Sequence, residues 1–215
     1  MAYNKIIEDQ LNAEYHRRIT THALKQSVSP EALETMIAAN IGQDAIRYQV
    51  GHDHFHYDNN SFQAGDAYLG QMRRAVTEAL AGSQALPAWQ AFGRLLHAAQ
   101  DFYAHSNYVA LWRERHPQAA PDQTPPLADD ALTDSRLHSG RLYYPLEILG
   151  FIPALHWLVL PWLPRDSHTW MNKDDPSRPD FEFAYAAAVK RTAFEFQTVI
   201  ESLSSTQAAL FTGQP

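Results

Sequence analysis

The segment from residue 97 to residue 107 reads His-Ala-Ala-Gln-Asp-Phe-Tyr-Ala-His-Ser-Asn, which places His97, Asp101 and His105 at successive four-residue intervals. The surrounding residues predict a helix, in which a four-residue step returns to the same face with about 40° of drift. Two imidazoles and one carboxylate therefore form one stripe. Nitrogen and oxygen ligands at this spacing are typical of a metal centre on a rigid helix. The central Asp101 has two oxygens and is expected to bridge two metal ions.

A satisfied polar stripe on a half-buried helix is the alternative interpretation. Against it, apolar side chains lie on both flanks of the stripe, so the helix is expected to be buried. A buried group of histidines and a carboxylate without partners costs free energy, and metal coordination removes that cost. We therefore favour a metal site. The neighbouring Gln100 is expected to point about 100° away from the stripe, so that its removal would leave metal content almost unchanged.

Composition limits the ligands and the classes of partner. The 215 residues include no cysteine, so disulfides are excluded and a zinc ion must take histidine, carboxylate, amide or backbone ligands. The net charge of -7 argues against a broad nucleic-acid-binding surface. The polar N-terminus has no apolar run of signal-peptide length, so we expect a cytoplasmic protein.

Helical periodicity predicts one all-α domain over residues 1–215. Helices are expected at about 3–26, 31–48, 62–80, 87–114 and 181–203. Ser29-Pro30-Glu31 has the cap, the proline and the acid that are typical of a helix start. Residues 116–135 are rich in proline, and we expect them to form an exposed, mobile loop without regular structure.

Residues 142–164 are almost wholly apolar but are interrupted by four prolines, at positions 145, 153, 161 and 164. A membrane-spanning helix needs about 20 largely uninterrupted apolar residues, so a span is excluded. Two interpretations remain. A helical hairpin buried in the core is favoured, because the prolines make a poor amphipathic helix. The alternative is an exposed apolar lid that makes peripheral contact with a membrane.

The segment from Leu95 to Val109 resembles the core motif of the HET-C proteins, distant relatives of the zinc-dependent bacterial phospholipases C and the fungal single-strand nucleases. Weaker similarities follow in family order, from about residue 21 to residue 196. They are Thr21-His22-Ala23-Leu24, an aspartate at position 44, Asp53-His54-Phe55-His56-Tyr57-Asp58-Asn59-Asn60, and Ser167-His168-Thr169-Trp170-Met171-Asn172-Lys173-Asp174. The resemblance implies a helical domain of that type, with its metal site between helices.

The resemblance also implies a set of ligands for two or three divalent ions, zinc above all. The first ion would be held by His97, Asp101, Asp44 and His54, with His52 or His56 as substitutes for His54. A second ion would be shared by Asp101 and His22. In the secreted phospholipases a processed N-terminal tryptophan also binds this ion. This chain has no such ligand, unless Tyr15 or His16 takes its place. His16 otherwise defaults to a surface or core role.

The third ion would be held by His105, His168 and an acid beyond His168. The secreted enzymes have a glutamate four residues after that histidine, where this chain has Asn172. The resemblance therefore leaves Asp174 or Asp175 to supply the carboxylate, and we favour Asp174.

The activity that the resemblance implies is zinc-dependent hydrolysis of a phosphoric ester. We expect phospholipase C-type cleavage of a lipid or small-molecule phosphoester, with Asp101 holding the metals and Asp44 accepting a proton. A nuclease or 3′-nucleotidase on the same scaffold is one alternative. The other is a non-catalytic HET-C-like membrane or interaction protein whose zinc is structural.

Overall fold

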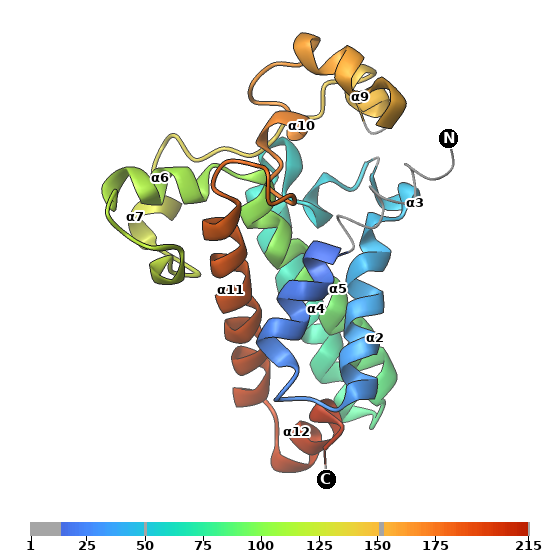
Figure 1. Ribbon diagram of the computed structural model, residues 1–215. Coiled ribbons are helices and arrows are strands. Elements are labelled where there is room, and N and C mark those ends of the chain that lie inside the picture. Colours follow the sequence, from blue (N-terminus) through green and yellow to red (C-terminus); the bar gives the residue numbers. More distant parts are fainter. Residues whose placement is uncertain (1–13, 50, 151–152, 215) are drawn as a thin grey trace.

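The computed structural model describes residues 14–49, 51–150 and 153–214 (Figure 1). These residues form helices joined by loops, without any strand, so the all-α prediction is confirmed. The part of the first expected helix before residue 14 lies outside the described residues; its described part covers residues 14–24. The elements that follow are α2 (Pro30–Ile41), η1 (Gly42–Asp44), α3 (Ile46–Gln49), η2 (Asp53–Phe55), η3 (Asp58–Asn60), α4 (Phe62–Ala81), α5 (Ala85–His105), α6 (Tyr108–Arg115), η4 (Pro121–Gln123), α7 (Asp129–Leu132), α8 (Leu146–Gly150), α9 (Pro153–Val159), η5 (Leu160–Trp162), α10 (His168–Met171), α11 (Phe181–Glu201) and α12 (Ser205–Thr212).

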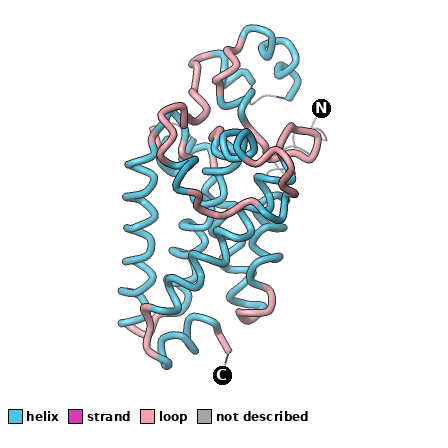
Figure 2. The backbone as a smooth tube through the Cα atoms, turned by 90° about the vertical axis from the view of Figure 1, so that its left-hand side faces the viewer, coloured by secondary structure: helices cyan, strands magenta, loops and turns pink. Residues whose placement is uncertain are grey.

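Helix α5 is the centre of the bundle and packs against α2, α4 and α11 (Figures 1 and 2). Every residue of α5 from Leu95 to His105 is buried. The stripe predicted from the sequence therefore lies in the interior of the protein, as its apolar flanks indicated. Its polar groups must find all their partners inside the protein or on a bound ion.

A glycine allows α2 and α5 to approach closely beside the stripe. A Cβ atom on Gly93 would lie 2.2 Å from the carbonyl oxygen of Met36 and 2.8 Å from the Cβ atom of Ala39. Only a residue without a side chain fits there. One turn further along α5, this approach brings Asn40 next to His97. The start of α2 is the predicted one, with the Ser29 side chain accepting from the backbone of the first turn.

Two expected helices are interrupted next to the site. The helix expected over 87–114 is divided, because Ser106 has an extended backbone and α6 starts only at Tyr108. The side chain of Lys173 donates to the carbonyls of Ala104 and Ser106 and so satisfies groups that a continuing helix would have used. Likewise, the helix expected over 31–48 ends at Ile41 and continues as η1 and α3.

The proline-rich segment from residue 116 to residue 135 is not devoid of regular structure, since it contains η4 and α7. The prolines do limit these helices to one turn each. The hydroxyl of Tyr108 donates to Pro125 O at 2.9 Å, and Lys190 donates to Thr124 O at 2.9 Å. Tyr103 also donates to Pro126 O. These bonds hold the segment against α6 and α11, so its backbone has fixed partners.

The apolar segment over 142–164 forms a short helical hairpin, but the hairpin is not buried in the core. Large side chains on it are exposed, among them Trp157 and Trp162. The favoured prediction of a core hairpin is therefore wrong, and the exposed alternative describes the structure. The prolines explain the difference, because they divide the segment into helices of at most seven residues that offer the bundle no long apolar face. Among the described residues, no helix combines the length and apolarity needed to cross a membrane.

Candidate metal centre

Two clusters of histidine and aspartate side chains lie near the C-terminal end of α5. The first cluster consists of His16, Asp44, His56, His97 and Asp101. Helix 14–24, η1, the residue after η2, and α5 each contribute to it. Four of the five side chains are almost completely buried, while that of Asp44 is 30% exposed. Segments far apart in the sequence therefore bring ligand-type groups to one interior point, where the Asp44 side chain is in contact with solvent.

The atoms of the first cluster have the spacing that a small cation requires. Asp101 Oδ2 lies 2.9 Å from His56 Nδ1 and 3.0 Å from His97 Nε2, and these two nitrogens are 3.0 Å apart. Asp101 Oδ1 lies 3.2 Å from His16 Nε2. Asp44 Oδ1 is 3.7 Å from His97 Nε2, and Asp44 Oδ2 is 4.0 Å from His16 Nε2. Bonds of about 2.0–2.1 Å in a tetrahedral zinc site put neighbouring ligand atoms roughly 3.3 Å apart, close to these values.

Gln100 is fully buried against this cluster. Its Nε2 atom donates to the hydroxyls of Thr20 and Thr192, and Thr192 in turn donates to a carbonyl of its own helix. Its Oε1 atom accepts from Asn40 Nδ2 at 3.1 Å and from His16 Nδ1 at 2.7 Å. Gln100 is thus bonded to neighbouring helices and not to the stripe, as expected, but α5 is enclosed on several sides, so Gln100 still reaches the cluster through His16 and Asn40.

These hydrogen bonds fix the proton positions on two histidines. Because Gln100 Oε1 is an acceptor, His16 Nδ1 carries a hydrogen. Asn40 uses its Nδ2 to donate to Gln100, so its Oδ1 accepts from His97 Nδ1 at 3.2 Å. Both rings therefore present Nε2 to Asp101. A bare lone pair facing a carboxylate oxygen at 3.0 to 3.2 Å is repulsive, so each contact requires a proton or a cation between the two atoms.

Several buried polar atoms at the first cluster make no hydrogen bond among the described residues. They are Asp44 Oδ2, His56 Nε2 and the hydroxyl oxygen of the adjacent Tyr15, while Asp101 Oδ1 has the contact with His16 at 3.2 Å. Leaving a buried polar atom unpaired costs about 1–3 kcal/mol. Their concentration at one place indicates that the site is built around a further group.

Burial and charge act in opposite directions on these histidines. Burial lowers the pKa of His16, but the Asp101 carboxylate outweighs it and raises that pKa to about 9. The pKa of His56 is raised for the same reason, whereas burial holds the pKa of His97 below its ordinary value. Burial alone would raise the pKa of Asp101; instead His97, His105 and His16 keep it well below its ordinary value. The Asp101 carboxylate therefore favours protonation of His16 and His56, whereas burial favours the neutral form of His97.

The second cluster consists of Asp58, His105, His168 and Asp174. Asp58 Oδ1 lies 2.9 Å from His168 Nδ1 and 3.5 Å from His105 Nδ1. Asp174 Oδ2 lies 3.7 Å from His105 Nε2, and Asp174 Oδ1 makes no hydrogen bond. All four side chains are buried. The second cluster has the same kinds of group as the first, with two imidazoles instead of three and two carboxylates. Its atoms are less closely spaced.

His56 connects the two clusters. Its ring belongs to the first cluster, while its carbonyl oxygen accepts from His105 Nδ1 at 3.0 Å. This bond leaves His105 Nε2 directed towards Asp174. Burial lowers the pKa of His105, but Asp101 and Asp58 outweigh it and raise that pKa to about 10.

The structure divides the predicted ligands into three sets. Asp44, His97 and Asp101 lie in the first cluster. The predicted third-ion group is brought together as the second cluster, with His105, His168 and Asp174. The remaining two predicted ligands, His22 and His54, lie elsewhere.

His22 is exposed, and its Nδ1 atom lies 3.3 Å from the hydroxyl of Tyr185. Helix 14–24 directs it outwards, whereas His16, six residues earlier, faces α5. His54 packs its ring against Phe55 and Tyr68, and His56 occupies the place expected for it. Simple alternation along residues 52–58 does not predict this, because the segment folds into 3₁₀ turns instead of an extended strand.

Two residues of the clusters were outside the favoured set of ligands, His16 having been named only as a possible substitute at the second ion. His16 lies four residues before Thr20, and both face Gln100, so a polar pair on an otherwise apolar helix face was the signal that could have found it. Asp58 follows His56 by two residues in the histidine-rich segment. Its side chain is turned into the interior by residues 57 and 59, whose backbones have positive φ angles.

Sequence comparisons place these residues in a family. The human von Willebrand factor A domain-containing protein 7 is 39% identical over 88 residues, and the rat and mouse proteins of that name are each 38% identical over 88 residues. The match covers 40% of this chain and 10% of each relative, so the chain resembles a small part of much longer proteins. No solved structure matches the chain.

These findings correct the resemblance to the HET-C proteins and to the zinc-dependent phospholipases C. The relatives are von Willebrand factor A domain-containing proteins, and none of them is named as a phospholipase or nuclease. The prediction of a phosphoric ester hydrolase, whether phospholipase C or nuclease, is therefore wrong. Histidines and an aspartate one turn apart are a local solution that unrelated helical proteins also use, so the motif does not identify a family. The family model that describes the VWA7 N-terminal domain matches residues 7–126, more than half of the sequence, and the chain therefore belongs to that family.

Proposed function

We propose that this domain binds divalent transition-metal ions, with one ion at the first cluster and a second at the second cluster. The observation that carries the proposal is the convergence of three imidazoles on the one carboxylate of Asp101, at 2.9 to 3.2 Å. Two of those imidazoles have their other nitrogen fixed as a donor to an amide oxygen. Such a partner sets the orientation of a metal-binding histidine and increases its basicity.

Zinc is the ion that suits this set of donors. With no cysteine in the chain, the donors are imidazole nitrogens and carboxylate oxygens, which zinc binds at about 2.0–2.2 Å in a tetrahedral arrangement. A hard ion such as calcium prefers an all-oxygen shell of six to eight ligands, and the first cluster offers only two carboxylates. The partial exposure of Asp44 supplies an entry path.

A bound ion would join four segments of the chain. It would lie between Asp101 and its histidines, and it would give a partner to the unpaired atom Asp44 Oδ2. Because the unfolded chain holds no such site, the free energy of binding stabilises the folded domain. That the chain is an enzyme stays a prediction, and the proposed metal site does not depend on it.

The test measures metal content and stability together. Protein loaded with zinc and freed of excess ion is analysed by elemental analysis, and the ion positions by anomalous scattering at the zinc edge. We expect bound zinc at both clusters, and Asp101→Asn should remove at least one ion per chain. Asp122→Asn, an equal change on an exposed aspartate, should remove none. Wild-type protein that retains no zinc, or an Asp101→Asn variant with full metal content, would refute the proposal.

A further inference from the structure

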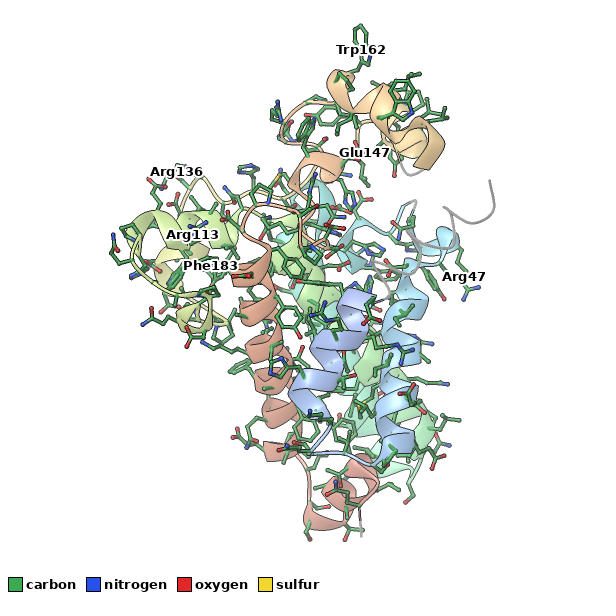
Figure 3. All side chains as sticks on the ribbon, in the orientation of Figure 1. Arg47, Arg113, Arg136, Glu147, Trp162 and Phe183 are labelled. Carbon is green, nitrogen blue, oxygen red and sulfur yellow. The ribbon has the colours of Figure 1, made fainter. Side chains whose placement is uncertain are left out.

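The hairpin that stands apart from the bundle has the features of a surface that other molecules cover. We name the described residues 144–150 and 153–165 the apolar hairpin; they contain α8, α9 and η5. Figure 1 shows it beyond α10, at the end of the molecule opposite α12. In Figure 3, Trp162 lies at the outermost point of this end and Glu147 at its base.

Exposed apolar side chains are concentrated on this hairpin. Trp162 is 77% exposed, Trp157 70%, Leu158 51% and Tyr144 45%. Among the described residues outside the hairpin, only three other large apolar side chains are exposed, those of Leu86, Leu127 and Phe194. Water in contact with two indole rings and a leucine is unfavourable, so this surface gains free energy when it is covered.

The charges of the apolar hairpin differ from those of the whole chain. Its one acidic residue, Glu147, is fully buried and accepts from the backbone and hydroxyl of Thr169. The exposed Arg165 lies over the ring of Trp170, with 3.7 Å between the guanidinium carbon and the ring centroid. At the base, Asp166 is engaged by Tyr143 and by Arg141, whose side chain is 57% exposed. A chain of net charge -7 thus offers here an apolar tip with the exposed Arg165 and no exposed acid of its own, while next to it Asp166, whose side chain is 38% exposed, pairs with Arg141.

The shape of the hairpin favours one class of binding partner over another. The described part of α9 has seven residues, and the 3₁₀ turn η5 with its proline follows it, so the described residues offer no long helical face to a groove of a protein partner. The tip is a projection and needs no complementary pocket when it enters a fluid layer. Tryptophan prefers the boundary between head groups and acyl chains, where its ring is buried and its N–H remains hydrated.

We propose that the apolar hairpin docks on a lipid bilayer with anionic head groups, inserting Trp157, Leu158 and Trp162 at the interface. The inference goes beyond the proposed metal binding and does not depend on it. The base of the hairpin is attached by Glu147 to Thr169 and by the pairing of Arg141 with Ser167. Arg165 lies behind the tip, where it would meet lipid phosphates.

The experiment is co-sedimentation of the full chain with vesicles of phosphatidylcholine alone or mixed with phosphatidylserine. We expect binding to the mixed vesicles, with a blue shift of tryptophan fluorescence and quenching by lipids brominated in the acyl chains. The double variant W157S/W162S should bind on the order of tenfold more weakly or worse, because two buried rings are lost from the interface. Leu86→Ser, at an exposed leucine on α5, should bind as the wild type does.

Each further outcome decides the question. If W157S/W162S does not fold by circular dichroism, Leu158→Ser and the bromolipid quenching of the wild type provide the same test. Absence of binding to both kinds of vesicle overturns the proposal, as does equal binding by wild type and double variant. A wild-type dimer that W157S/W162S turns into a monomer, without vesicle binding, shows instead that the hairpin covers itself in a second copy.

Discussion

Gln100 Oε1 lies 2.7 Å from His16 Nδ1, and this contact joins a residue of the central helix to one from the N-terminal helix. The same oxygen accepts from Asn40, whose own carbonyl group orients His97. One buried amide thus sets the proton positions on two imidazoles that face Asp101. Gln100 is a positioning residue: it touches no proposed ion and acts through the two histidines.

We therefore expect Gln100→Met to weaken zinc binding by roughly 10- to 100-fold, the range for loss of a partner behind a metal ligand. Methionine retains the length of the side chain and removes both hydrogen-bonding groups. The measurement is a zinc titration against a competing chelator, together with nitrogen NMR of His16 and His97 to read their tautomers.

The control is Gln90→Met, the same change on an exposed residue of the same helix. It should leave affinity and tautomers unchanged. A Gln100→Met protein with lower stability but unaltered tautomers and affinity would show that Gln100 only fills space.

The contact between α2 and α5 makes a second prediction. Gly93→Ala places a methyl group against the carbonyl of Met36, and neither backbone can move without separating the helices. We expect a loss of about 1–3 kcal/mol in the free energy of unfolding, typical of overpacking in a core. Denaturant titration measures it. Gly70→Ala, where the nearest atom is the end of an arginine side chain at 3.7 Å, should instead stabilise α4 by roughly 0.5–1 kcal/mol. Equal effects at both glycines would contradict the close approach.

The raised pKa values of His16 and His105 predict how pH changes the effect of zinc. Their folded values of about 9 and about 10 lie above the ordinary value near 6.5. The stability that their protonation gives the metal-free protein is therefore complete below about pH 6.5 and is lost as pH rises through 9 to 10. Zinc must displace those protons, so its binding strengthens over the same range.

We expect the difference in melting temperature between zinc-loaded and chelator-treated protein to increase from pH 6 to pH 9. Differential scanning fluorimetry in buffers of matched ionic strength measures this difference. A difference that stays constant or shrinks over that range would show that these imidazoles do not exchange protons for the ion.

The sequence predicted the parts of this structure that depend on one helical period. The spacing of His97, Asp101 and His105 correctly indicated a buried stripe, and the proline and cap at Ser29 marked the start of α2. Three kinds of feature could not be predicted from the sequence. Which histidine of residues 52–56 faces inwards depends on 3₁₀ turns that leave no periodic pattern. The part played by Gln100 depends on helices distant in sequence. The exposure of the apolar hairpin depends on how short its helices are, since apolarity alone equally fits a core.

The two clusters should bind their ions independently. They are linked by the bond from His105 to the backbone carbonyl of His56 and by the charge of Asp101, which raises the pKa of His105; a substitution at His168 removes neither. His168→Ala removes an imidazole from the second cluster alone, where Asp58 lies 2.9 Å from it. We expect this variant to lose one zinc ion per chain and to retain the first-cluster ion, and the double variant with Asp101→Asn to lose both. Elemental analysis of the purified variants gives the stoichiometry, and His138→Ala, at a histidine whose ring nitrogen contacts the loop carbonyl of Arg136, is the matched control. If His168→Ala loses all its zinc, the two clusters form one coupled centre; if it loses none, the second cluster is a hydrogen-bonded network without an ion.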